Sequence, residues 1–236
     1  MRKPKGRPGS GARPQGRVFN LRLPSKKVIA AARSTLDARR GQMSAFEANK
    51  GALTAHFSSA AEADTWTRRR NDAFYPKFRR LWCNALGNRF QANGWERKGK
   101  GSDFRELSTS VMRVLHAEPH ERDEVVMVEI DRLTELKLPT RRSVFTEMLC
   151  QYFPHDYHLD NEPVKAWQSS TGFKSPYGVS AGYRYLECAS LLRAALFNAQ
   201  NGRGGYPLDN LGELDAIICL ERAGRLFSLP CRANTS

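Results

Sequence analysis

Residues 140–154 read TRRSVFTEMLCQYFP, and this stretch indicates the fold class more clearly than any other part of the chain. Its apolar residues are Val144, Phe145, Met148, Leu149 and Tyr152. They recur at spacings of three and four, which places them on one face of an α-helix. Thr140 is suited to cap the start of this helix, and Pro154 ends it because proline cannot donate a backbone hydrogen bond. The stretch therefore predicts a helix packed on a core.

Helical spacing and helix punctuation continue on both sides of this stretch. Further helices are expected over residues 28–41, from 46 onward, 60–90 with an interruption near Pro76, 103–115, 121–136, 163–168, 180–199 and 210–222. Three helix starts are predicted by a capping residue followed three residues later by Glu: Ser44 with Glu47, Ser59 with Glu62 and Asp103 with Glu106. Gly224 is expected to end the last helix. Residues 125–130 are partly β-branched and leave a strand open as an alternative. The sequence predicts an all-α, multi-helix globular protein.

Composition excludes several classes of protein. With 236 residues, of which 40% are hydrophobic, the chain is long enough to bury a core. It contains no apolar run of about 18 residues and no apolar stretch typical of a secretory signal, so a cytoplasmic location without a membrane is expected. Its five cysteines are widely spaced and include no C-x-x-C pair, which favours reduced thiols over a disulfide framework or a zinc site.

Positive charge is concentrated in the first part of the chain. Residues 1–100 contain 23 Lys and Arg against 6 Asp and Glu, a formal charge of +17, whereas residues 101–236 contain 15 against 18, a formal charge of −3. Cations placed on phosphates release condensed counterions and so contribute affinity that depends on salt. The asymmetry predicts nucleic acid as the partner.

The chain divides into three predicted segments. Residues 1–24 are rich in Gly, Pro, Lys and Arg, carry no acidic residue and have few apolar side chains, so they are expected to form a disordered basic arm. The arm either tracks phosphates or serves only as a solubilising terminus. Residues 25–100 are expected to form a basic helical region, and residues 101–236 a helical domain.

Within the basic region, Phe74, Phe78 and Trp82 recur at helical spacing. This spacing favours core packing over the alternative of a platform on which unpaired bases stack. Cations occupy the other side of the same helix and the loop that follows. The predicted phosphate-binding residues are Arg68, Arg69, Arg70, Lys77, Arg79, Arg80, Arg97, Lys98 and Lys100.

The segment from Leu136 to Trp167 resembles the helix-hairpin-helix segment of helical DNA-binding modules associated with restriction and repair proteins. The resemblance consists of a Leu138-Pro139 turn, a helix, and a following stretch with proline, tyrosine and aspartate. The later residues 183–186 and 211–216 are similar to the C-terminal helices of modules found beside restriction-type ATPases and nucleases. This resemblance implies a helix-hairpin-helix-like fold in residues 101–236 and favours DNA over RNA.

The hairpin itself departs from the pattern of these modules. Their hairpin is rich in glycine, which lets backbone amides approach a phosphate, whereas residues 139–143 read PTRRS and contain no glycine. A helix start that carries Arg141 and Arg142 still offers a dipole and two guanidinium groups to a phosphate. The alternative is that both arginines form surface ion pairs with Glu135 or Glu147.

Two enzymatic alternatives rest on single carboxylates. In glycosylases of the helix-hairpin-helix type, an aspartate shortly after the hairpin is catalytic, and Asp160 lies in the corresponding region. Asp160 or Asn161 is equally suited to cap the next helix. The tripeptide from Glu135 to Lys137 matches the Glu-x-Lys of metal-dependent nucleases, which place it on a strand.

Histidines and acids also raise the question of a metal site. His155, Asp156, His158 and Asp160 are close in sequence, but no third remote ligand follows a recognisable pattern. His116 and His120 are four residues apart, yet Pro119 between them is incompatible with the helical turn that such a pair needs. The sequence predicts no metal and no cofactor.

The sequence as a whole favours a protein that binds nucleic acid, mainly through the phosphate backbone and by charge and shape. One alternative is a DNA-repair or restriction-related nuclease or glycosylase. Another is a protein-interaction subunit whose basic arm docks on an acidic partner.

Overall fold

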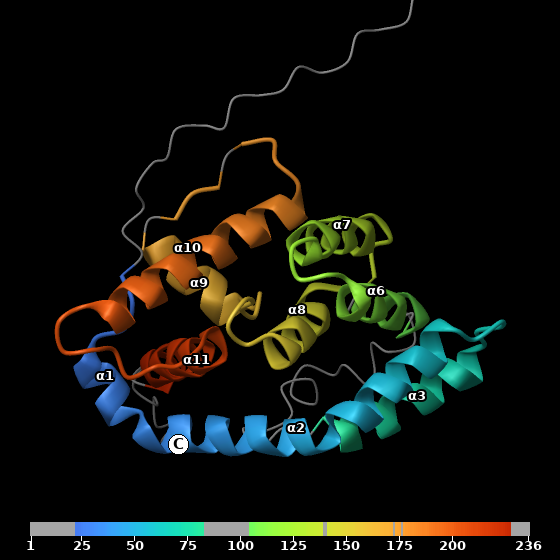
Figure 1. The fold of residues 1–236 in the computed structure, drawn as a ribbon, viewed down its shortest axis with the longest axis horizontal. Helices are drawn as coiled ribbons and strands as arrows, with labels where there is room; N and C mark the ends of the chain where they lie inside the picture. Colours follow the sequence, from blue (N-terminus) through green and yellow to red (C-terminus); the bar gives the residue numbers. More distant parts are fainter. Residues whose placement is uncertain (1–21, 83–103, 139–140, 172, 176, 228–236) are drawn as a thin grey trace, which may run out of the picture.

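The computed structural model of the chain describes all residues except 1–21, 83–103, 139–140, 172, 176 and 228–236 (Figure 1). The side chains of residues 141–142 and 221–227 are also outside the description. The described residues form helices and no strand, which confirms the predicted all-α class. The helices are α1 (Lys26–Ala31), α2 (Arg33–Ala61), α3 (Arg68–Leu81), α6 (Phe104–His116), α7 (Arg122–Glu135), α8 (Arg141–Tyr152), α9 (Glu162–Ser170), α10 (Ala181–Asn201) and α11 (Leu211–Phe227).

Most helices begin at a polar residue that caps the first turn. The side chains of Ser25, Thr67, Asn161, Ser180 and Asn210 accept a hydrogen bond from the backbone amide three residues later. These bonds satisfy amides that have no partner within the helix. Five of the described helices therefore start where local side-chain chemistry favours a start.

Two of the predicted helix starts are wrong. Ser44 and Ser59 lie inside α2, where they cannot act as N-caps. The predicted start at residue 103 agrees with α6, although Asp103 itself lies outside the described residues. Capping residues are common in sequence, and the pattern marks a start only where the preceding residues leave the helix.

The long helix α2 replaces two predicted helices, because the expected break near Gly41 does not occur. A glycine in a helix costs about 1 kcal/mol relative to alanine. On either side of Gly41, α2 buries Leu36 and Phe46 completely or nearly so. Packing of these side chains outweighs the local cost. The predicted helix over residues 60–90 is likewise wrong in its start, since α2 ends at Ala61 and Thr67 caps a new helix.

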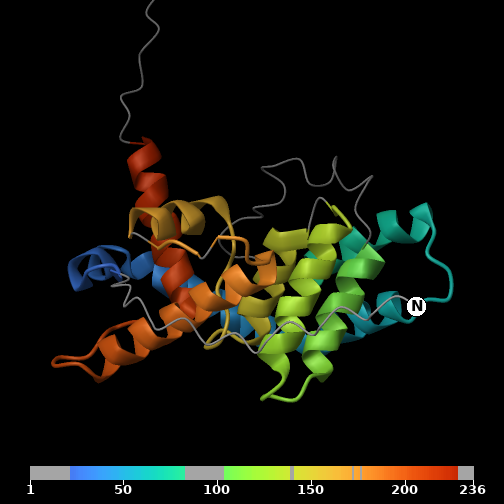
Figure 2. The ribbon, with the colours of Figure 1, turned by 90° about the horizontal axis from the view of Figure 1, so that it is seen from above.

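The long helix α2 lies along one side of the molecule, and the other helices lie mainly on one side of it (Figure 1). Helices α6 and α11 pack directly on α2, while α7 packs on α6, α8 and α10. Figure 2 shows α3 and α11 at opposite ends of the molecule. The basic helix α3 therefore lies at the periphery, where it packs on α2 and α6.

Two apolar clusters form the core. The first cluster joins the second half of α2 to α3, α6, α7 and α8, and it contains Phe74, Phe78 and Trp82, which confirms their predicted core position. The second cluster joins α1 and the first turns of α2 to α9, α10 and α11. Leu23 packs against the second cluster, and the Tyr206 hydroxyl donates a hydrogen bond to the Pro24 carbonyl at 2.7 Å. The last residues of the predicted basic arm are therefore held on the folded body.

Two further expectations concern the C-terminal half. Residues 125–130 belong to the helix α7, so the strand alternative is wrong. Helix α11 continues through Gly224 to Phe227, so the predicted end at Gly224 is wrong as well. Among the helices that the structure describes, none has the length and apolar character needed to cross a lipid bilayer.

Candidate nucleic-acid interface

The basic helix α3 is fixed in rotation by its buried face. Phe74, Phe78 and Trp82 are buried in the first cluster. The side-chain oxygen of Asn71 accepts hydrogen bonds from the indole Nε1 of Trp66 at 3.2 Å and from the backbone amide of Phe104 at 3.0 Å. These contacts leave α3 one orientation on α2 and α6, and they define which of its residues face outward.

All six cations of α3 are exposed, as the sequence predicts. They are Arg68, Arg69, Arg70, Lys77, Arg79 and Arg80. Arg68 and Arg79 are eleven residues apart, and so are Arg69 and Arg80. Eleven residues correspond to about three helical turns and a rise of about 16 Å. Each pair therefore lies on nearly the same line along the outer face of α3.

Within α3 itself, one acidic residue accompanies these six cations. Asp72 is the one acidic residue in the sequence of α3, and its carboxylate lies 3.9 Å from Arg68 Nε. Both side chains of this pair are largely exposed, so the ion pair is weak. The arginines at positions 68–70 also occupy the first turn, where the helix dipole disfavours positive charge by about 0.3–1 kcal/mol for each residue. This placement costs stability, and an external anion would relieve it.

The opposite flank of α3 borders a shallow cavity of about 510 Å³ at the junction with α2. Its walls include two cations, Arg70 and Lys77, and two acids, Glu62 and Asp64. Since the charges balance, this flank has no net preference for an anion. Phosphate binding is therefore better supported by the outer face, which we define as Arg68, Arg69, Arg79 and Arg80.

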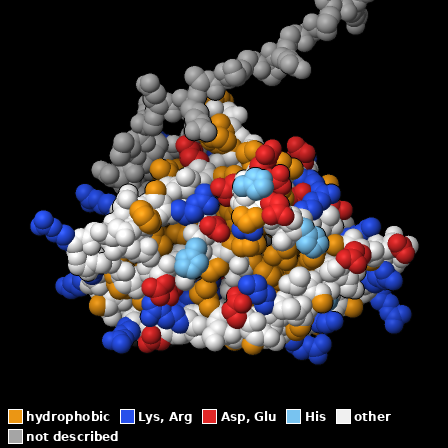
Figure 3. Space-filling model, viewed as in Figure 1, with side chains coloured by type: hydrophobic (Ala, Val, Ile, Leu, Met, Phe, Trp, Pro, Cys, Tyr) orange, Lys and Arg blue, Asp and Glu red, His pale blue; other side chains and the backbone are white. Residues whose placement is uncertain are grey.

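Exposed cations on the molecule are distributed unevenly. On the face seen in Figure 3, Lys and Arg side chains protrude mainly around the rim, including the end at which Figure 1 places α3. Hydrophobic side chains are exposed nearer the centre of the same face. The rim at α3 and the apolar centre are thus chemically distinct surfaces.

The other predicted phosphate contacts are not brought together with α3 by the described structure. Arg97, Lys98 and Lys100 lie outside the described residues. Arg141 and Arg142 begin α8, as predicted from the sequence, but their side chains are not described. Helix α6 lies between α8 and α3 (Figure 1). The candidate interface that the structure defines in detail is therefore α3.

Asp160 lies away from α3, beside a small cavity of about 160 Å³. Its side chain is 15% exposed, and its Oδ1 lies 3.8 Å from Lys165 Nζ. Asn161, rather than Asp160, caps α9 by accepting a hydrogen bond from the Val164 amide at 3.0 Å. The carboxylate of Asp160 and the ammonium group of Lys165 therefore form an ion pair. The cavity beside them has room for about five water molecules.

The histidines considered as metal ligands are separated. His158 is buried, its ring lies against Tyr185, and its Nε2 is 3.3 Å from the amide nitrogen of Gln168. Burial lowers the pKa of His158 to about 3. His116 ends α6 and His120 lies beyond it in the turn, so the two do not share a helical face. In the described part of the chain, no three His, Cys, Asp or Glu side chains are grouped closely enough to hold a metal ion.

The Glu-x-Lys tripeptide lies at the end of α7. Glu135 is the last residue of the helix, and Lys137 adopts a positive φ of 52° in the turn that follows. The described residues form no strand on which the geometry of a nuclease of this type would be built. The tripeptide is part of a helix end.

Sequence reasoning missed the polar network around Glu129. The carboxylate of Glu129 is buried and accepts hydrogen bonds at 2.7 Å from Ser110, Arg113 and Arg132. These donors lower the pKa of Glu129 against the opposing effect of burial. The spacing of Glu129 and Arg132 within one helix was a signal for part of the network, but the contacts to α6 depend on tertiary packing.

Comparison of the chain with known proteins identifies no relative. No protein-family model matches the chain, and no curated protein or solved structure is significantly similar to it.

Proposed function

We propose that this chain binds nucleic acid through the phosphate backbone, with the outer face of α3 as the contact surface on the folded body. The observation that supports this most directly is the pair of arginine rows: Arg68 with Arg79, and Arg69 with Arg80. All four are exposed, and their ends are about 16 Å apart along the helix. Guanidinium groups are well suited to phosphate oxygens because they donate several hydrogen bonds in one plane.

This arrangement favours contact with the backbone over readout of bases. A spacing of about 16 Å corresponds to about five base-pair steps along B-form DNA. Arginines at both ends of a short helix can therefore reach phosphates that are several nucleotides apart. Neutralisation of about four phosphates gives a salt-dependent affinity with little dependence on sequence.

Two parts of the chain extend the proposal beyond α3. Residues 1–24 supply a basic arm that follows the phosphates of a bound nucleic acid. The segment from α7 to α9 supplies a helix-hairpin-helix-like contact, in which Arg141 and Arg142 at the start of α8 hold a phosphate. The resemblance of this segment to DNA-binding modules favours DNA over RNA as the partner.

Salt titrations with matched charge variants test the α3 contact. The test variant replaces Arg68, Arg69, Arg79 and Arg80 with alanine. The control variant replaces four exposed cations elsewhere, Lys27, Arg33, Arg184 and Arg203, so that both variants lose the same formal charge. Binding of each to a labelled 24-base-pair duplex, to single-stranded DNA and to RNA is measured by fluorescence anisotropy over a series of salt concentrations.

We expect the α3 variant to reduce the slope of log affinity against log salt by about 3.6 for duplex DNA, since about 0.9 is lost for each of about four phosphate contacts. The control variant changes the slope by less than 1. Circular dichroism checks that both variants remain helical. Equal slopes for the native chain and the folded α3 variant would exclude α3 as the contact surface. Tighter binding to RNA than to duplex DNA would exclude DNA as the preferred partner.

A further inference from the structure

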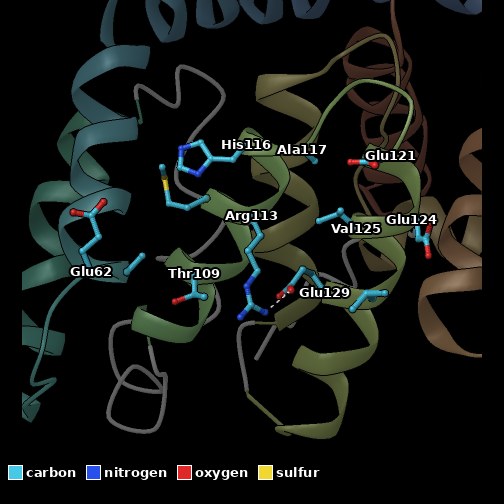
Figure 4. Close-up of a pocket in the computed structure, with 12 residues that line it drawn as sticks. Glu62, Thr109, Arg113, His116, Ala117, Glu121, Glu124, Val125 and Glu129 are labelled. Atoms are coloured by element: carbon cyan, nitrogen blue, oxygen red, sulfur yellow. Dashed lines mark hydrogen bonds and ion pairs between the residues drawn. The ribbon is translucent and has the colours of Figure 1, made fainter.

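A second surface of the molecule has the opposite character to α3. It is a concave groove of about 730 Å³ over the hairpin of α6 and α7, closed at one side by the end of α2 (Figure 4). Helix α6 contributes Thr109, Met112, Arg113 and His116 to its lining, and Ala117 follows directly after this helix. These positions repeat at spacings of three and four, so they form one continuous stripe on α6.

Helix α7 contributes a stripe with the same spacing. Its lining residues are Glu124, Val125, Val128 and Glu129, and they are preceded by Glu121 at the N-cap position. Eight residues of helix extend about 12 Å, so the two stripes define a groove about two helical turns long. Two neighbouring helices that carry such stripes side by side form a groove into which a third helix can pack.

The centre of the groove is apolar. Met112 lies in the floor, and Val125, Ala61 and Ala117 are partly buried around it. Val128 is 52% exposed, which makes it one of the large apolar side chains that the described surface leaves open to water. Covering these side chains with a partner is favourable, since it removes apolar surface from water.

The rim of the groove is acidic. Glu62, Glu121 and Glu124 are exposed carboxylates that line it. The cation in the groove, Arg113, is paired with the buried carboxylate of Glu129 at 2.7 Å, as Figure 4 shows. Four glutamates and one arginine thus line the groove of a chain whose formal net charge is +14. Such a rim repels phosphates and attracts cations.

We propose that this groove binds an amphipathic α-helix of a partner protein, about two to three turns long, with an apolar stripe flanked by Lys or Arg. The paired stripes match the shape of a helix, the apolar floor matches its apolar stripe, and the glutamate rim matches its basic flanks. The basic helix α3 of a second copy does not fit, because its outward positions carry no large exposed apolar side chain. Nucleic acid and partner helix therefore bind at different surfaces.

The experiment uses the full chain and designed peptides as probes. The first peptide is a capped 16-residue helix with Leu at core positions spaced by three and four and Lys at the flanks. The second replaces each flanking Lys with Glu, and the third is a scrambled sequence of the first. Binding is measured by fluorescence anisotropy at about 0.15 M salt, where the Debye length is about 8 Å.

Two variants of the groove are compared with matched controls on exposed positions outside it. Val128→Gln is paired with Leu136→Gln, which alters the other exposed apolar residue at α7. One double variant carries Glu121→Lys and Glu124→Lys. Its control carries Glu118→Lys and Glu135→Lys, so both double variants change the net charge of the chain by the same amount.

We expect the native chain to bind the Lys-flanked peptide at least tenfold more tightly than the Glu-flanked or scrambled peptide. Val128→Gln weakens this binding at least fivefold, and Glu121→Lys with Glu124→Lys reverses the preference between the two helical peptides. The control variants retain native affinity. Absence of binding to the Lys-flanked peptide, equal affinity for both helical peptides, or native affinity in the two groove variants would each overturn the proposal. Displacement of the bound Lys-flanked peptide by duplex DNA would overturn the separation of the two surfaces.

Discussion

The imidazole of His56 lies flat against the phenyl ring of Phe74, with ring centroids 4.2 Å apart and planes inclined by 14°. Its Nε2 also donates a hydrogen bond to the Phe74 carbonyl at 3.0 Å. One residue of α2 thus holds both the side chain and the backbone of α3. The direction in which the arginine rows face depends on the position and rotation of α3 on α2. The contact with His56 therefore helps to place the arginines of the candidate interface, although His56 is not one of them.

Replacing His56 with alanine should therefore lower the free energy of unfolding by about 1–3 kcal/mol, through loss of one hydrogen bond and of ring stacking. Urea denaturation measures this change. His120→Ala, at an exposed position, serves as the control and should leave stability within about 0.5 kcal/mol of native. A stable His56→Ala variant would mean that α3 is held by its apolar contacts alone.

The buried imidazole of His158 should make stability depend on pH. Burial lowers the pKa of His158 from 6.5 to about 3, so the unfolded chain binds a proton there before the folded chain does. This contribution to stability is complete above pH 6.5 and is lost progressively as the pH falls toward 3. The limiting slope is about 1.4 kcal/mol for each pH unit.

Urea denaturation between pH 7 and pH 5 measures this slope before most carboxylates titrate. We expect the native chain to lose about 1–2 kcal/mol over this interval, and His158→Gln to lose less, although it is less stable at pH 7. His56, whose pKa burial also lowers, contributes to the slope of both proteins. His155→Gln, at an exposed position, should retain the native slope. Equal slopes in all three proteins would remove His158 from this explanation.

A pair of glycine substitutions distinguishes close packing from helix propensity. A Cβ atom added at Gly182 would lie 2.2 Å from the backbone oxygen of Met127, whereas one added at Gly51 would meet nothing within 4 Å. We expect Gly182→Ala to lower the free energy of unfolding by about 1–3 kcal/mol, because the backbone of α10 or α7 must move to make room for the added methyl group. Gly51→Ala should instead stabilise α2 by about 0.5–1 kcal/mol. Thermal denaturation of both variants should show shifts of opposite sign.

The neighbours Asp160 and Asn161 should differ in their effects. Asn161→Ala removes the cap of α9 and should cost about 1 kcal/mol in the free energy of unfolding. Asp160→Ala leaves this cap in place, and we expect the native chain and this variant alike to leave duplex and single-stranded DNA intact with Mg²⁺ present. Gel assays of cleavage and base release test this expectation. Turnover by the native chain that is lost in a folded Asp160→Ala variant would assign an enzymatic role to this carboxylate.

Sequence patterns predicted the parts of this fold that depend on local periodicity. The stripe of Phe74, Phe78 and Trp82 predicted a buried face of α3, and therefore the exposed arginines opposite it. The continuity of α2 through Gly41 could not be predicted, because it depends on side chains that are buried by distant helices. The helix starts expected at Ser44 and Ser59 were wrong for the same reason.

The groove over α6 and α7 was not predicted, although its residues follow a regular spacing. Glutamates alternate with the apolar residues of its lining, as at Glu124 and Val125, so neither helix shows a second purely apolar stripe. Its third side is provided by Ala61 and Glu62, whose position depends on where α2 ends. Surfaces that are assembled from three helices leave little signal in the sequence of any one of them.

The length of α2 has a consequence for how the protein unfolds. This helix contributes Leu36 to the second cluster and Phe46, Leu53 and Phe57 to the first. Neither cluster can lose α2 without exposing apolar side chains to water, so both should melt in one cooperative transition. A fragment that begins after residue 61 would retain most helices of both clusters but would lack α2, the helix that contributes to both. We expect this fragment to populate a loosely packed, aggregation-prone state.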